Sequence, residues 1–452
     1  MSSAEVSDGP DGSDSNKGFL FRVTTATAIG EGLDGYDLGA ISVVLPTIIK
    51  EFDLSAVESG LIGASTLAGI FVGGPVFGYL TDRFGRRRIF ILDLIAFVVL
   101  GALQSVVTDN WQLLVLRLLL GFAIGAEYAI GQTMLAEFVP SKGRGIRLGS
   151  LQSCWYAGFL ISVVIAYGML SLGIDWRWIL ATGVVPALVT LGLRQGIPES
   201  PRWLLSQGRE EEARAIVSKH LGDTYFNDED LGDESTDEAS FKDLFAPKLR
   251  SRTAFACIFY TCLVAPYFAI FTFAPQVFTS LGVQDPKASV VGTNLVAVLG
   301  AIAGMLVIER VGRRPLLLAS FWVMVVTLGL IGGWGAAPSI ILIVSFVLFA
   351  FFNAISGVMT GVYPAEIFPS ELRGTGVGLA SAVSRIGAAG GTFLLPIGID
   401  RWGIGPSLLV GAAICAVGLA ATYLWAPETT DLSLTKSKSA TAPRRAAAKA
   451  AT

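Results

Sequence analysis

Twelve long apolar stretches account for most of the chain and constrain its fold more than any other feature. An α-helix needs about 20 residues to cross a hydrocarbon core of about 30 Å, and each stretch is close to that length or longer. A membrane β-barrel is excluded because its strands would read as alternating segments of about ten residues. We therefore expect an all-α membrane protein with twelve transmembrane helices. The stretches cover residues 21–49, 58–80, 89–107, 111–138, 146–171, 177–196, 253–281, 289–308, 315–333, 339–363, 374–399 and 405–425.

The composition agrees with a chain that lies mostly in lipid. Only 15% of the 452 residues are charged, whereas a soluble protein carries about 25%. A soluble multidomain enzyme is thereby excluded, and the net charge of −3 gives no basis for nucleic-acid binding. One histidine and four cysteines without a Cys-x-x-Cys pair leave no familiar metal site. We expect neither enzymatic activity nor a metal or other cofactor.

Basic residues gather in the loops after the even-numbered stretches, for example at Arg86, Arg87 and Arg313. By the positive-inside rule these loops face the cytoplasm, which places both termini there as well. We expect a multi-pass protein of the plasma membrane. Residues 1–18 are rich in Ser, Asp and Gly, and residues 428–452 end in Ala, Lys and Arg, so we expect two disordered cytoplasmic tails.

Three short patterns occur twice, about half a chain apart. The pattern that begins at Asp82 recurs 227 residues later, and those that begin at Glu137 and Pro198 each recur 229 residues later. Such nearly equal offsets indicate two halves of six helices each. We expect a bundle at 19–196, a charged cytoplasmic linker at 197–252 and a second bundle at 253–427.

Two of these patterns resemble motifs of a known family. Residues 78–87, Gly-Tyr-Leu-Thr-Asp-Arg-Phe-Gly-Arg-Arg, are similar to the loop between helices 2 and 3 of the major facilitator superfamily. Residues 198–204, Pro-Glu-Ser-Pro-Arg-Trp-Leu, resemble the motif of its sugar-porter-like division, which includes sugar, organic-ion and aromatic-acid proton symporters. The resemblance covers nearly the whole chain and implies alternating access, in which the two halves rock around a central site.

The resemblance also implies that charged residues at the cytoplasmic helix ends act as latches of an inner gate, pairing when the gate is closed. The alternative is that the arginines only fix the topology. The expected gate residues are Asp82, Arg83, Arg86, Glu137 and Arg144 in the first half, and Glu309, Arg310, Arg313, Glu366 and Arg373 in the second.

Ionisable residues inside an apolar stretch are costly, so each is a candidate for function. Asp37 in the first stretch and Arg117 in the fourth lie at depths from which they can meet. A carboxylate that separates from its arginine in a dry site takes up a proton, so this pair offers proton coupling. Both residues match the acid and arginine that serve this role in related sugar symporters. Asp34 is a rival, because aromatic-acid symporters have a similar Asp-Gly-x-Asp pattern, and a static ion pair is the structural alternative.

Arg385 is the most discriminating charged residue. It lies roughly eleven residues, or about 16 Å, into the eleventh stretch, too deep to reach the interface easily. Organic-anion carriers of this division have a similar arginine, and a guanidinium binds a carboxylate in bidentate fashion. The competing interpretation pairs Arg385 with Glu127, at comparable depth in the fourth stretch, as a structural ion pair.

Departures from the sugar-porter pattern also favour an anion. Sugar porters usually carry a Gln-Gln pair in helix 7 and a tryptophan in helix 10, whereas this chain reads Cys-Ile-Phe-Tyr-Thr from Cys257 and has Gly361 at the tryptophan position. Much of the polar set that a sugar needs is therefore missing, although Gln152 matches a sugar-contact position. Besides Arg385 and Glu127, the expected substrate-binding residues are Gln152, Trp155, Tyr156, Tyr260, Tyr267, Phe268, Phe271 and Asn353.

The residues together predict a secondary active transporter. The leading interpretation is a proton-coupled symporter that imports a small organic anion, such as an aromatic or sugar-derived carboxylate. A proton-coupled sugar or polyol symporter is the close alternative, and a drug or metabolite exporter is a third. A receptor on the same fold is disfavoured because the proton-site and latch residues are present. We expect a monomer whose partners are a small-molecule substrate, protons and the lipid bilayer, driven by the proton gradient.

Overall fold

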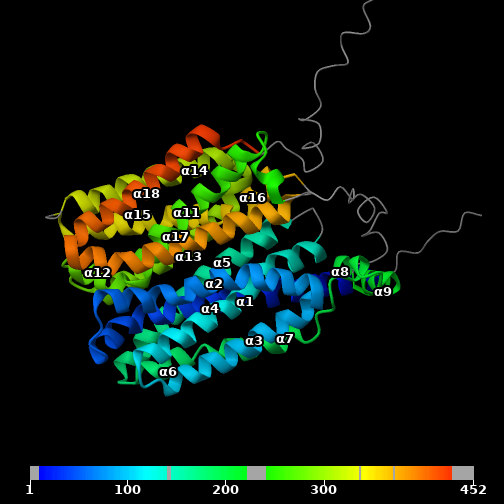
Figure 1. Cartoon of the computed structure of the whole chain (residues 1–452), viewed down its shortest axis with the longest axis horizontal. Coiled ribbons are helices and arrows are strands. Elements are labelled where there is room, and N and C mark those ends of the chain that lie inside the picture. Colours follow the sequence, from blue (N-terminus) through cyan, green and yellow to red (C-terminus); the bar gives the residue numbers. More distant parts are fainter. Residues whose placement is uncertain (1–9, 140–143, 221–240, 335–336, 370–371, 430–452) are drawn as a thin grey trace, which may run out of the picture.

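The computed structural model describes residues 10–139, 144–220, 241–334, 337–369 and 372–429, which are almost entirely helical. Twelve helical stretches are long and apolar enough to cross a membrane, which confirms the all-α class and the number of spans. The first bundle occupies the lower part of Figure 1 and the second bundle the upper part, with their helices running in similar directions. The first helix, α1 (Pro10–Glu51), begins within the predicted amino-terminal tail, and residues 430–452 of the other tail lie outside the described residues.

The first bundle is built from six spans, several of which begin at a side-chain cap. α2, for example, begins at a capping box in which the Ser55 hydroxyl accepts the Glu58 N–H and the Glu58 carboxylate accepts the Ser55 N–H. After α1 the elements are α2 (Ala56–Phe84), α3 (Arg86–Leu103) with η1 (Gln104–Val106), α4 (Asn110–Phe138), α5 (Arg144–Ser171), and α6 (Trp176–Ala181) with α7 (Val184–Arg194).

The second bundle repeats this plan. Its elements are α11 (Arg250–Thr272) with α12 (Ala274–Ser280), α13 (Pro286–Val311), α14 (Arg313–Gly333), α15 (Ser339–Gly357) with α16 (Met359–Ile367), α17 (Arg373–Trp402) and α18 (Ile404–Trp425). The sixth, seventh and tenth spans are broken into two helices, which the sequence analysis did not anticipate. Pro186 and Pro275 lie shortly after the breaks in the sixth and seventh spans, where a proline lacks the N–H that a continuous helix requires. Pro364 lies inside α16 and does not account for the break at Val358.

The linker contributes short helices at one end of the molecule. They are α8 (Pro201–Ser206), α9 (Glu210–His220) and η2 (Phe241–Phe245), and Figure 1 shows α8 and α9 at the right-hand end. We call this the linker end and the other the opposite end. α8 starts where the Ser200 hydroxyl accepts the Trp203 N–H, with Pro201 in the first turn. The His220 ring stacks on Phe19 at 4.3 Å between centroids, which fastens α9 to α1.

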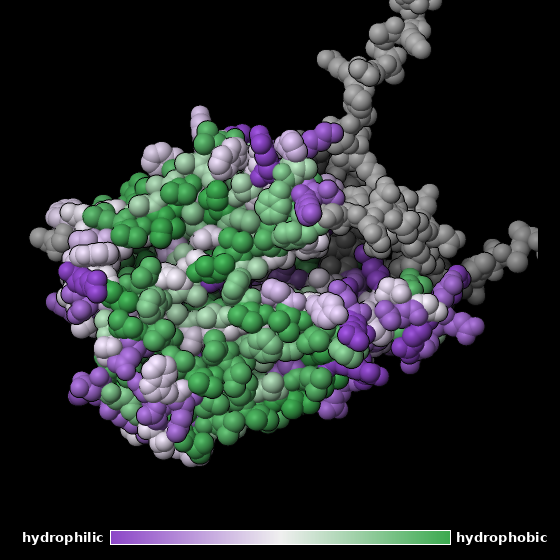
Figure 2. All heavy atoms as spheres, viewed as in Figure 1, coloured by the Kyte–Doolittle hydropathy of each residue, from purple (hydrophilic) through white to green (hydrophobic). Residues whose placement is uncertain are grey.

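The two bundles contact each other mainly through α2 with α17 and through α5 with α13. Near the opposite end α2 and α17 lie so close that a Cβ on Gly60 would fall 2.4 Å from the Phe393 carbonyl oxygen. Small residues permit such backbone contact between membrane helices. Toward the linker end, a Cβ on Gly78 or Gly378 would meet open space, and Figure 2 shows polar side chains in a recess between the bundles there. The halves are thus closed at the opposite end, with a recess toward the linker end.

Candidate transport site

A small cavity lies between the two halves, near the middle of the spans. Its volume is about 40 Å3, enough for a few water molecules, whereas pockets that hold metabolites measure about 300–1,000 Å3. A metabolite therefore fits only if the halves move apart here. The cavity is lined by Tyr128, Gln152, Trp155 and Tyr156 of the first half and by Tyr260, Leu263, Val264, Tyr267, Phe268, Asn353, Gly357, Thr360 and Arg385 of the second.

Arg385 of α17 is the single charged residue in this lining. It is 4% exposed, and its guanidinium carbon lies 4.4 Å from the centroid of the Tyr128 ring and 5.8 Å from that of Phe268. Tyr128 belongs to α4, so this cation–π contact spans the two halves. Arg385 makes no ion pair and no hydrogen bond with the residues that the structure describes, and its Nε is buried without a partner. A buried guanidinium with free donors is suited to bind an anion.

Aromatic rings from both halves form most of the remaining wall. Trp155 meets Phe268 edge to face at 5.8 Å between centroids, and Tyr156 meets Tyr267 in the same way at the same distance. The Trp155 indole N–H and the Tyr267 hydroxyl have no hydrogen-bond partner in the described part of the chain. These rings offer flat apolar surfaces together with a few unused polar atoms.

Two amide side chains add hydrogen-bonding capacity to the wall. Gln152 comes from α5 and Asn353 from α15, and both line the cavity as expected. The Asn353 amide already donates to the Leu263 carbonyl at 3.0 Å. Its carbonyl oxygen is left to accept a further hydrogen bond.

Two expected substrate contacts lie elsewhere. Glu127 accepts a hydrogen bond from Arg194 of α7 at 2.5 Å, so the alternative that paired it with Arg385 is wrong. Depth along a helix does not give the direction around its axis, and Glu127 points into the first bundle. Phe271 stacks on Tyr267 at 4.3 Å between centroids and supports that ring from outside the cavity lining.

Asp37 and Arg117 meet as the sequence predicts. Arg117 Nη2 lies 2.8 Å from Asp37 Oδ2, and Nη1 lies 3.3 Å from Oδ1, which is a bidentate arrangement. The Gln104 side-chain oxygen lies 3.4 Å from Arg117 Nη1. All three residues are buried, so the pair is shielded from solvent and joins α1 to α4.

A second buried charge cluster lies in the first half, and sequence reasoning missed two of its members. Arg194 contacts Glu127, lies 3.7 Å from Asp93 of α3 and donates to the Phe90 carbonyl at 3.1 Å. Asp93 and Arg194 both fall inside predicted apolar stretches, and the cost of burying a charge there was the signal that would have found them.

Glu31 and Asp34 on α1 complete the buried charges of this half. Glu31 Oε1 and Asp34 Oδ2 are buried without a hydrogen-bond partner in the described residues. Both carboxyl groups interact electrostatically with Arg385 across the boundary between the halves. An unpaired carboxyl group in such a place is a candidate proton carrier.

The gate motifs form matching contacts in the two halves. At the linker end Glu137 binds Arg86 and Ser200, and Glu366 binds Arg313 and Thr429. The Glu199 carboxylate accepts the N–H groups of Arg86 and Arg87, and Glu428 does the same for Arg313 and Arg314. Each of these contacts joins elements of the same half and therefore braces a helix end.

The remaining gate candidates show less regular contacts. The Asp82 carbonyl accepts the Trp203 indole N–H, and Arg83 lies over the Phe84 ring. Arg310 is exposed, and Arg373 lies at the first turn of α17. The side chains of Arg144 and Glu309 lie outside the described part of the structure.

Two six-helix halves with a cavity at their junction are the architecture of one large class of secondary transporters. The family model for "sugar (and other) transporter" matches residues 23–440, and the chain belongs to this family. It is a multi-pass protein of the plasma membrane. Membership confirms the sugar-porter-like resemblance and, because the family consists of transporters, the expectation of a transport protein.

Named relatives differ in what they carry. The inner membrane metabolite transport protein YgcS of Escherichia coli is 37% identical over 92% of this chain and 93% of its own. The cis,cis-muconate transport protein of Acinetobacter baylyi is 30% identical over 79% and 82%. The fold matches the xylose transporter XylE from E. coli in a partially occluded inward-open conformation, with a TM-score of 0.78 at 21% identity, over 92% of this chain and 100% of the other.

Proposed function

We propose that the protein is a proton-coupled symporter that imports a small organic carboxylate by alternating access. The observation that carries this proposal is Arg385, a buried guanidinium in the cavity wall without an anionic contact among the described residues. A buried charge is costly unless something neutralises it. A substrate carboxylate would supply the missing bidentate partner.

The aromatic walls favour a substrate with a flat, partly apolar body. Trp155, Tyr267 and Phe268 present ring faces and edges next to Arg385. A planar body would stack on these rings while its carboxylate reached the guanidinium. The relative named for muconate transport fits this class of substrate.

Proton coupling is assigned to the first half. In this proposal Asp37 exchanges between its ion pair with Arg117 and a protonated state as the halves move. Asp34 is the second candidate carrier, since one of its carboxylate oxygens is buried without a partner in the described part of the chain. Protonation of Asp34 and Glu31 would also remove negative charge near Arg385 and so favour entry of a substrate anion.

We assign the linker end to the cytoplasm, with the paired gate residues holding the helix ends there. The assignment rests on the arginines of the loops at this end, such as Arg86 to Arg88, and on the positive-inside rule. The recess between the halves then opens inward. Glu137 with Arg86 and Glu366 with Arg313 would act as latches if their contacts change as the recess closes.

A sugar or polyol symporter is the second candidate. Gln152 and Asn353 line the cavity with amide groups, which suit hydroxyl-rich ligands. Relatives named as xylose and glucose transporters, at 30% identity, fit this alternative. In that case Arg385 would be structural.

The two candidates are separated first by a ligand screen. Thermal unfolding of the purified protein in detergent is recorded with carboxylates, sugars, polyols and inorganic phosphate. A bound ligand stabilises by RT ln(1 + [L]/Kd), so even weak substrates raise the melting temperature at millimolar concentration. Shifts from carboxylates alone support the proposal, and shifts from sugars or polyols alone favour the alternative.

The role of Arg385 is then tested by uptake into proteoliposomes. Arg385→Gln is expected to reduce carboxylate uptake by at least about 30-fold, because a buried charged contact is lost. Arg401→Gln, which removes an exposed arginine from the last turn of the same helix, serves as the matched control and should leave uptake unchanged. Retained uptake in Arg385→Gln would contradict the carboxylate role.

A further inference from the structure

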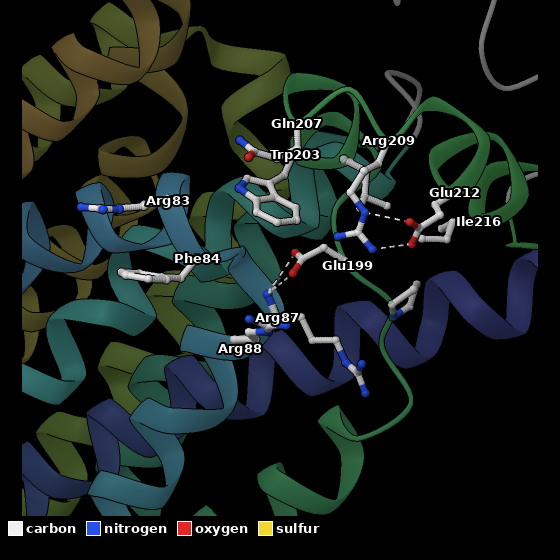
Figure 3. Close-up of a pocket in the computed structure, with 12 residues that line it drawn as sticks. Arg83, Phe84, Arg87, Arg88, Glu199, Trp203, Gln207, Arg209, Glu212 and Ile216 are labelled. Atoms are coloured by element: carbon white, nitrogen blue, oxygen red, sulfur yellow. Dashed lines mark hydrogen bonds and ion pairs between the residues drawn. The ribbon is translucent and has the colours of Figure 1, made fainter.

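A second hollow lies at the linker end of the first half, away from the central cavity. It measures about 500 Å3 and is bounded by the loop between α2 and α3, the residues before α8, and α8 and α9 themselves. Figure 3 shows Arg83, Phe84, Arg87 and Arg88 on one side and Trp203, Arg209 and Ile216 on the other. The gate contacts do not account for a space of this size, which raises the question of what it binds.

The acidic groups in this hollow are already engaged. Glu199 accepts the N–H groups at the start of α3. Glu212 accepts two hydrogen bonds from Arg209, at 2.7 and 2.6 Å, and this contact lowers the pKa of Glu212. The N–H groups that Glu199 binds are neutral and leave its charge in place, so the lining carries four arginines against two glutamates and keeps a net positive charge.

The remaining arginines are available to a ligand. Arg83 and Arg88 make no ion pair or side-chain hydrogen bond with the residues that the structure describes. The Arg87 guanidinium donates to the Gln195 carbonyl at 3.2 Å and meets no carboxylate there. All three residues line the hollow, with Arg87 and Arg88 side by side below Glu199 and Arg83 apart from them in Figure 3. Their guanidinium groups offer forked donors that match a phosphate group.

The internal repeat separates the shared contacts at the helix ends from the arginines of the hollow. In the second half Glu428 accepts the N–H groups at the start of α14, and Arg314 donates to the Tyr423 carbonyl, as Arg87 does to Gln195. The position equivalent to Arg88, however, is Pro315. Arg88 is thus an addition to the shared motif.

The hollow also has an apolar rim. Phe84 is 47% exposed, and Leu204 and Ile216 line the same space. Inorganic phosphate would leave this rim unused, whereas a phospholipid would place its headgroup among the arginines and its glycerol and acyl carbons against the rim. The combination favours a ligand that is both phosphorylated and amphipathic.

We propose that this hollow binds a phosphate-bearing anion, most fittingly the headgroup of an anionic phospholipid. Arg83, Arg87 and Arg88 bind the phosphate oxygens, and Phe84 and Ile216 contact the apolar part. The bound lipid joins the α2–α3 loop to α8 and α9 and so holds the linker against the first half. This site is independent of the transport proposal, because it binds no transported substrate.

Thermal unfolding of the full-length protein in detergent at constant ionic strength tests the proposal. The probes are short-chain phosphatidylglycerol, short-chain phosphatidylcholine and inorganic phosphate. Phosphatidylglycerol is expected to raise the melting temperature saturably, and Arg88→Gln to raise the half-saturating concentration about tenfold, as for the loss of one charge-assisted contact. Arg202→Gln removes an exposed arginine of α8 outside the hollow and should stay within about twofold of wild type.

The outcomes separate the sources of the phosphate. Stabilisation by phosphatidylglycerol that depends on Arg88 supports a lipid site, and Arg88-dependent stabilisation by inorganic phosphate alone supports the same chemistry with a soluble anion. If neither phosphatidylglycerol nor inorganic phosphate stabilises the protein, the proposal is overturned. So does an equal loss in Arg88→Gln and Arg202→Gln, which would indicate general attraction to a basic surface. If Arg88→Gln does not fold, the same measurement is made with Arg83→Gln.

Discussion

The two six-helix halves share their architecture at the linker end but differ in the charge that they bury. Glu137 and Glu366 bind equivalent arginines in the two gate motifs. Deeper in the spans, the described residues of the first half include five buried acidic side chains and two buried arginines, whereas those of the second half include one buried charged side chain, Arg385. The buried groups of the first half are Glu31, Asp34, Asp37, Asp93, Glu127, Arg117 and Arg194.

This difference indicates a division of work between repeated units. An excess of buried carboxyl groups suits the first half for binding and releasing protons. An arginine without a carboxylate contact suits the second half for holding an anion. The two proposed functions would meet at the cavity, where Arg385 lies over Tyr128 of the first half. Substitutions of the buried charges in the first half should therefore differ in their effects from substitutions of Arg385 in the second half.

The largest expected effect on stability comes from two buried arginines that differ in their partners. Arg194→Met would leave Asp93 and Glu127 buried without their cation, and we expect the free energy of unfolding to fall by about 3–5 kcal/mol. Arg385→Met breaks no ion pair or hydrogen bond within the described residues and removes cation–π contacts and a longer-range attraction to Glu31 and Asp34, so we expect a smaller loss of about 1–2 kcal/mol. Denaturation in detergent micelles measures both variants. Equal losses would mean that Arg385 has a structural ion pair after all.

A smaller effect is expected from two buried aspartates of the first half. Asp93 lies beside Arg194 and accepts the Leu94 N–H at 2.7 Å, so Asp93→Asn should cost about 1–3 kcal/mol. One carboxylate oxygen of Asp34 is buried without a partner in the described residues, and Asp34→Asn should change stability by less than about 0.5 kcal/mol. The same unfolding assay compares them, and a larger loss for Asp34→Asn would show that its carboxylate is a structural ligand.

The gate motifs should respond alike in the two halves. Glu137→Gln and Glu366→Gln each weaken a partly buried ion pair and a hydrogen bond. We expect each to cost about 1–2 kcal/mol and the two values to agree within about 0.5 kcal/mol. Melting temperatures of the single variants provide the check. A large difference would show that the two copies of the motif contribute unequally to stability.

The smallest effect concerns α9 of the linker, which meets the first half through the stacking of His220 on Phe19. Burial against Phe19 lowers the pKa of His220 below 6.5. The neutral ring is therefore favoured in the folded state, so its contribution is present above pH 6.5 and is lost as the pH falls through the lowered pKa. Wild type should lose slightly more stability on mild acidification than His220→Gln, by less than about 1 kcal/mol. Identical pH dependence in the two proteins would contradict this contact.

Much of the fold could be predicted because its signals are long and repeated. Twelve apolar stretches and nearly equal repeat offsets specify the spans and the two halves without knowledge of any contact. The breaks near Pro186 and Pro275 were missed because a proline inside a membrane helix is often tolerated. Whether the helix continues depends on its neighbours in the bundle.

The contacts of the site could be predicted only where the depth of two residues along their helices was enough to show that they meet. Asp37 and Arg117 lie on helices that pack together, so similar depth brought them into contact. Glu127 and Arg385 also have similar depth, but Glu127 faces Arg194 inside the first bundle. The direction around a helix axis depends on packing, which hydropathy does not encode.

The central claim is that the first half couples protons and the second half binds the substrate anion. Transport in proteoliposomes tests it most directly, by comparing proton-driven accumulation with exchange of labelled for unlabelled carboxylate in Asp37→Asn and Arg385→Gln. The account predicts that Asp37→Asn loses accumulation but retains exchange, and that Arg385→Gln loses both. Exchange retained in Arg385→Gln, or accumulation retained in Asp37→Asn, would contradict it.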